Sequence, residues 1–198
     1  MSDKAQAMLQ SMLDEMAGEF PGFRIVPKHD DRLSHFIDVV LRIVTFGAQN
    51  EYLTRYHTVL GNRLYVPGRW ASTAPLDRLI TLRHERVHLR QRRRFGSALM
   101  AFLYLVPFFP LGLAYGRARI EWEAYAETIR ATAELYGLSA ARAPALRDHV
   151  VRQFTSGAYG WMWPFPKTIE SWYEGVIREL RDPGCSPEVH ANGTQGEA

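Results

Sequence analysis

Cysteine is almost absent from this sequence. The only one, Cys185, lies near the C-terminus, so the chain cannot form an internal disulfide, and a metal site built on cysteine pairs is excluded. The N-terminus contains acidic residues and lacks the apolar core of a secretory signal. We therefore expect a cytoplasmic protein.

Motifs of nucleic-acid binding and of oligomerisation are also lacking. The net charge is only +3, and the densest basic run, at 90–94, has no aromatic residues interleaved with it. We expect this run to be a solvated helix face and expect no nucleic-acid partner. The composition, 46% hydrophobic and 23% charged over 198 residues, is typical of one globular domain.

Hydrophobic periodicity predicts a mostly helical chain, and an α+β fold is expected. The predicted helices cover 3–17, 31–46, 72–94, 116–136, 139–154 and 167–181. Between them, the segment 52–67 is rich in Tyr, Thr, Val and Leu around Gly61-Asn62, which predicts a small antiparallel sheet with strands at 52–60 and 63–67. The expected organisation is an N-terminal amphipathic helix within 1–20, one domain at 21–181 and a disordered tail at 182–198.

The motif His84-Glu85-Arg86-Val87-His88 indicates a metal site on the predicted helix 72–94. Histidines four residues apart project from one helix face and can bind a single cation, for which Zn²⁺ is the expected ion. Glu85 lies at the flank of the pair, where it can act as general base on a metal-bound water without being a ligand.

A helical wheel separates this site from the basic side of the same helix. At 100° per residue the arginines at 83, 86, 90 and 93 lie opposite His84 and His88. We therefore expect the arginines to face solvent and the histidines to face the interior.

The predicted helix 116–136 offers a third ligand. Glu121 lies at the edge of its apolar arc, whereas Glu123, Glu127 and Glu134 form a charged stripe on another side. A carboxylate facing the interior is costly unless it is paired or binds a metal, which favours Glu121 as the ligand. The alternative is Glu123, with Glu127 four residues later.

An HExxH motif followed by the helical pattern Glu121-Trp122-Glu123-Ala124 resembles the gluzincin metallopeptidases. Similar groups are the small single-domain gluzincins, the CAAX-prenyl-protease-like membrane peptidases and the anti-repressor peptidases. The resemblance implies a zincin-like domain, Glu121 as third zinc ligand, and a peptide or protein substrate lying along a sheet edge. The sequence departs from these groups at Tyr125, where they carry an Asp or Asn bonded to a zinc histidine, and we expect the Tyr125 hydroxyl to replace it.

The sequence thus predicts a zinc-dependent hydrolase, a metallopeptidase with catalytic Glu85 and metal ligands His84, His88 and Glu121. The alternatives are a non-catalytic zinc protein and a peripheral membrane or interaction module. The latter would use the apolar segment 98–115, which we expect to be core but which, with its flanking arginines, suits contact with a membrane surface. Tyr159 and His57 are two candidates for stabilising an oxyanion.

Overall fold

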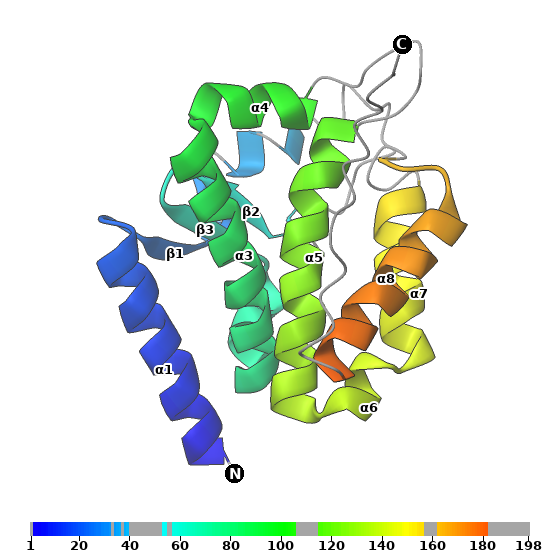
Figure 1. Cartoon of the computed structure of the whole chain (residues 1–198). Coiled ribbons are helices and arrows are strands. Elements are labelled where there is room, and N and C mark those ends of the chain that lie inside the picture. The colour runs from blue at the N-terminus through cyan, green and yellow to red at the C-terminus, as the bar shows by residue number, and fades with distance from the viewer. Residues whose placement is uncertain are drawn as a thin grey trace, which may run out of the picture.

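The computed structural model describes residues 2–32, 34–36, 38–39, 53–54, 57–105, 115–156 and 162–181. The helices are α1 (Ser2–Glu19), α3 (Pro75–Phe95), α4 (Ser97–Leu105), α5 (Tyr115–Tyr136), α6 (Leu138–Ala141), α7 (Pro144–Thr155) and α8 (Pro166–Arg181). The strands are β1 (Arg24–Pro27), β2 (Thr58–Leu60) and β3 (Arg63–Val66), with 3-10 turns η1 (Lys28–Asp30) and η2 (Gly68–Ser72). The fold is α+β and mostly helical, as the sequence predicts (Figure 1).

The sheet is mixed, with strand order β1-β3-β2. Strands β2 and β3 form the predicted antiparallel hairpin, and Gly61 in its turn has a φ of 60°, which glycine adopts without strain. Of the predicted strand 52–60, Thr58–Leu60 is a strand and 53–54 form a turn, while 52 and 55–56 lie outside the described residues. Strand β1 pairs in parallel with β3, so the expectation of a purely antiparallel sheet is wrong.

Helices α3 and α5 run antiparallel, side by side, through the centre of the molecule (Figure 1). Pro75 occupies the first turn of α3, where its missing N–H is not needed. Gly96 and Gly137, with φ of 81° and 90°, follow the last residues of α3 and α5, so both helices end where the sequence predicts.

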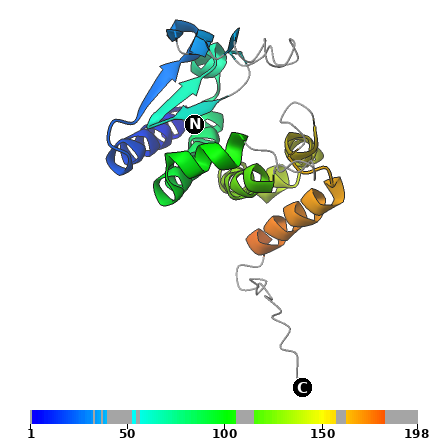
Figure 2. The ribbon, with the colours of Figure 1, turned by 90° about the horizontal axis from the view of Figure 1, so that it is seen from above.

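Two hydrophobic cores flank this central pair. The first joins α1 to the sheet and α3 through residues such as Leu9, Met16, Leu64 and Leu82. The second joins α5 to α6, α7 and α8: Ile129, Ala141, Phe154, Ile169 and Tyr173 are among its buried members. Figure 2 shows the sheet and α1 on one side of the molecule and α7 and α8 on the other.

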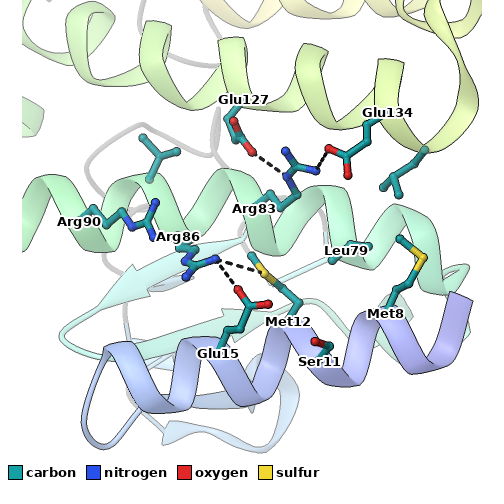
Figure 3. A pocket seen from close by; sticks show the side chains of 12 residues that line it. Met8, Ser11, Met12, Glu15, Leu79, Arg83, Arg86, Arg90, Glu127 and Glu134 are labelled. Carbon is teal, nitrogen blue, oxygen red and sulfur yellow. Dashed lines mark hydrogen bonds and ion pairs between the residues drawn. The ribbon is translucent and has the colours of Figure 1, made fainter.

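Part of the arginine face of α3 is an internal interface rather than a solvated surface. The Arg83 and Arg86 side chains are only 23% and 21% exposed. Their partners are glutamates of two neighbouring helices: Glu15 and Glu19 of α1, and Glu127 and Glu134 of α5. Figure 3 shows both arginines lining a cavity between α1, α3 and α5, together with Glu15, Glu127 and Glu134. The expectation of a solvent-facing side is therefore wrong for Arg83 and Arg86, which glutamates of α5 and α1 cover, whereas Arg90 and Arg93 are exposed as expected.

Several other sequence predictions fall on the remaining segments. The predicted helix 139–154 is two helices, α6 and α7, since Pro144 starts a new helix and cannot continue the old one. Of the apolar segment 98–115, α4 covers the first part, and 106–114 lies outside the described residues. Most of the predicted helix 31–46 and the predicted tail 182–198 also lie outside them. None of the described helices is long and apolar enough to cross a membrane.

Candidate metal centre

His84, His88 and Glu121 meet at the seam between α3 and α5. The Nε2 atoms of His84 and His88 lie 3.2 Å apart, and they lie 3.7 Å and 3.6 Å from Oε2 of Glu121. Glu121 is 3% exposed, whereas Glu123 is exposed and is not a member of the His84, His88 and Glu121 group. The structure thus brings together the three residues that the sequence analysis selected, and it does so with the favoured glutamate.

The spacing of these atoms fits a small cation. Ligand atoms about 2.0–2.1 Å from a tetrahedral zinc ion lie about 3.4 Å from one another. One of the three observed distances, 3.2 Å, is slightly shorter than this value, and the other two, 3.6 and 3.7 Å, are slightly longer. One carboxylate and two imidazoles are also a donor set that zinc prefers, and it leaves a fourth coordination position free. The residues present therefore fit a zinc ion.

Thr128 fixes the orientation of His84. The Thr128 hydroxyl donates to the Ala124 carbonyl at 3.2 Å and lies 2.9 Å from Nδ1 of His84, so it accepts the Nδ1 proton and leaves Nε2 free to bind a metal. The acceptor for this nitrogen is thus Thr128 rather than Tyr125, whose ring packs edge-on against the His84 imidazole at 4.9 Å. Thr128 comes seven residues after Glu121, so a wheel centred on Glu121 would have placed it about 20° away.

Gln91 has the same role for His88. Its side-chain carbonyl lies 3.1 Å from Nδ1 of His88, while its amide nitrogen donates to the Ile120 carbonyl at 3.0 Å and to Glu123 at 2.8 Å. Since both protons of the amide group are engaged, the carbonyl must face the histidine. Gln91, at 4% exposed, is a buried polar residue that the sequence analysis did not select, although its position three residues after His88 is one helical turn away.

Burial and nearby charges make the centre of this group attractive to a cation. Burial, together with the neighbouring His88, lowers the pKa of His84 to about 3. Burial also opposes the charge on His88, but the Glu121 carboxylate outweighs this effect and raises the pKa of His88 to about 9. The carboxylate thus holds one positive charge between the imidazoles, at the place where a metal ion would supply it.

Glu85 lies beside the ligands with the environment of a proton acceptor. The side chain is buried, with 7% of the residue exposed. Burial raises the pKa of Glu85 to about 7, with a further contribution from the Glu121 carboxylate, while His88 and Lys28 act in the opposite direction. A carboxyl group with a pKa near neutrality can take up and return a proton in one reaction cycle.

Lys28 and His57 approach the same region from the sheet side. Lys28 is fully buried and donates from Nζ to Oγ1 of Thr58 at 3.0 Å. Burial lowers the pKa of Lys28 to about 8, although the negative charges of Glu85 and Asp38 act to raise it. Burial lowers the pKa of His57 to about 4, and His57 in turn acts on the pKa of His84.

His57 is one of the candidates that the sequence offers for the site. Lys28 is not, because it lies in a short polar stretch without a motif. A charged side chain that is fully buried beside a candidate site is visible only in the fold. Tyr159, the other candidate for the oxyanion, lies outside the described residues. Met162 and Trp163, from the same aromatic segment, belong to the second core.

Comparison with known proteins adds no further assignment: no family model matches the chain, and no curated protein or solved structure is significantly similar to it.

Proposed function

We propose that this protein is a zinc-dependent hydrolase of the metallopeptidase type, similar in its site to the gluzincins. The observation that carries the proposal is the convergence of His84, His88 and Glu121 at distances close to a tetrahedral edge, with the buried Glu85 beside them. The Glu85 carboxylate is not a ligand and can accept a proton, which a site that only holds a metal does not need.

The chain's own residues have separate roles in this proposal. His84, His88 and Glu121 hold the ion, and Thr128 and Gln91 keep the two imidazoles oriented. Zinc bound there supplies a Lewis acid that lowers the pKa of water toward 7. The Glu85 carboxylate accepts a proton from the attacking water, whose oxygen bonds to the carbonyl carbon of the substrate. Glu85 then passes this proton to the nitrogen of the leaving group as the C–N bond breaks.

The sheet offers a place for an extended peptide. Among the described strands β2 pairs with β3 alone, and an extended peptide could pair with its other edge. His57, the residue directly before β2, acts on the pKa of His84, so this strand lies beside the metal centre. A substrate strand added to β2 would therefore pass close to Glu85.

Hydrolysis of an unstructured protein such as casein by the full chain, with and without a chelator, tests this proposal. We expect zinc-dependent cleavage by the parent protein and a loss of at least 100-fold in Glu85→Gln, which keeps the metal but lacks the proton acceptor. Glu123→Gln, on the neighbouring exposed position, is the matched control and should keep its activity. Zinc binding without any hydrolysis of proteins or peptides would instead favour a structural metal site.

A further inference from the structure

Five exposed apolar side chains gather at one end of the helical bundle. Phe95 ends α3, Leu99 and Phe102 lie on α4, Tyr115 begins α5, and Phe165 precedes α8. They are between 38% and 52% exposed. Figure 1 shows α4 across the top of α3 with the start of α5 next to it, and the start of α8 lower and to the right. We call this surface the apolar end.

Aromatic side chains join the α5 and α8 parts of the apolar end. The Trp163 ring lies 5.7 Å from Tyr115 on one side and 5.7 Å from Phe165 on the other, between ring centroids. Trp122 joins the same group at 5.6 Å from Trp163. Exposed aromatic rings backed by other aromatic rings form a broad apolar surface with polar edges, the character of side chains found at the boundary between lipid and water.

The chain segment that runs from the end of α3 through α4 to the start of α5 carries charge of one sign. From residue 92 to residue 119 the sequence contains five arginines and no aspartate or glutamate. The Arg94 guanidinium lies 5.1 Å from the centre of the Phe95 ring, and that of Arg119 lies 5.6 Å from the centre of the Trp122 ring. The cations thus lie among the exposed apolar side chains rather than on a separate face.

Helix α4 is fixed in the position that exposes these residues. A Cβ atom added at Gly116 would lie 2.7 Å from Cδ2 of Leu103, so the absence of a side chain at Gly116 lets α4 pack directly against the start of α5. Leu103 thereby anchors one side of α4, while Leu99 and Phe102, three residues apart, share an exposed side.

We propose that the apolar end docks the protein on an anionic lipid surface, with the exposed rings inserted among the headgroups and the arginines bound to lipid phosphates. The combination of apolar area and one-signed charge favours a lipid surface over a nucleic acid, which would not require the apolar side chains. Docking would hold His88, seven residues before Phe95, about 10 Å below the surface along α3. This inference does not depend on the hydrolytic activity.

Co-sedimentation of the full chain with vesicles of phosphatidylcholine, with and without phosphatidylglycerol, tests the proposal. We expect binding to the vesicles that contain phosphatidylglycerol and weaker binding as salt is raised. Arg93→Gln/Arg94→Gln should weaken this binding about 30-fold, and Leu99→Ser/Phe102→Ser about tenfold or more. Tyr136→Ser and Arg142→Gln, at the opposite end of α5 and beyond it, are the matched controls and should bind like the parent.

Three results would overturn the proposal. The first is a parent protein that does not sediment with phosphatidylglycerol vesicles. The second is Leu99→Ser/Phe102→Ser binding with the parent's affinity, because the exposed side of α4 would then have no part in it. The third is a parent that is a dimer by analytical ultracentrifugation and that becomes monomeric in this variant while lipid binding is unchanged. Circular dichroism of each variant establishes that a loss of binding is not a loss of fold.

Discussion

Replacing Thr128 with valine removes one hydroxyl group and keeps the shape of the side chain. In the parent protein that hydroxyl accepts the Nδ1 proton of His84 at 2.9 Å. Without it, His84 either leaves a buried N–H unpaired or moves the proton to Nε2, which then cannot bind a metal. Loss of such a partner lowers metal affinity about 10- to 100-fold. We expect a loss near tenfold, because the Ala124 carbonyl also interacts with His84.

Competition with a chromophoric zinc chelator measures this loss, and Thr132 provides the matched control. Thr132 lies one turn further along α5 and donates to the Thr128 carbonyl at 2.8 Å, so Thr132→Val removes a similar hydroxyl that does not touch a histidine. Thr132→Val should therefore bind zinc like the parent. If Thr128→Val also stayed within a factor of two of the parent, the hydroxyl would not orient His84 and the reasoning would be refuted.

Three further changes have expected outcomes that follow from the described contacts. Gln91→Leu should weaken zinc binding at least tenfold through His88 in the same competition assay, and unchanged affinity would contradict the role of the amide. Because burial holds the pKa of His57 at about 4, below its ordinary 6.5, the unfolded state takes up the proton first and the metal-free parent loses stability as the pH falls from 6.5 to 4. His84 adds to this loss, so His57→Phe should lose less stability than the parent, by at most about 3 kcal/mol, in urea unfolding with chelator at neutral pH and near pH 4. An equal pH dependence of the two proteins would contradict the burial of His57. Leu82→Ala, at a fully buried site, should lower the free energy of unfolding by about 2–5 kcal/mol, and a change below about 1 kcal/mol would contradict its place in the core.

The elements that carry the candidate site could be predicted because their signals are local. Gly96 and Gly137 end α3 and α5, and the spacing of His84 and His88 within one helix fixes their shared face. Glu121 could be separated from Glu123 because a regular helix turns each residue to a calculable side. These inferences need only the geometry of a single helix.

The features that were missed depend on contacts between distant parts of the chain. Strand β1 has only four residues, and its partner β3 lies almost forty residues later, so no local pattern identifies it. Its position also decides that Lys28, the next residue, is buried. The partial burial of Arg83 and Arg86 was missed because a helical wheel of α3 does not show the glutamates that α5 and α1 place against them.

The proposed metal centre requires that α3 and α5 hold one zinc ion between them. This is tested by the zinc content of three purified proteins, equilibrated at limiting free zinc: the parent, Glu121→Ala and Glu123→Ala. We expect one zinc per chain in the parent and in Glu123→Ala, because the exposed Glu123 carboxylate accepts from Gln91 and is not one of the three grouped ligands. Glu121→Ala should lose its zinc, since two imidazoles alone remain to hold it. A Glu121→Ala protein that retains zinc at the parent's stoichiometry, or a parent protein that binds none, would contradict the proposed metal centre.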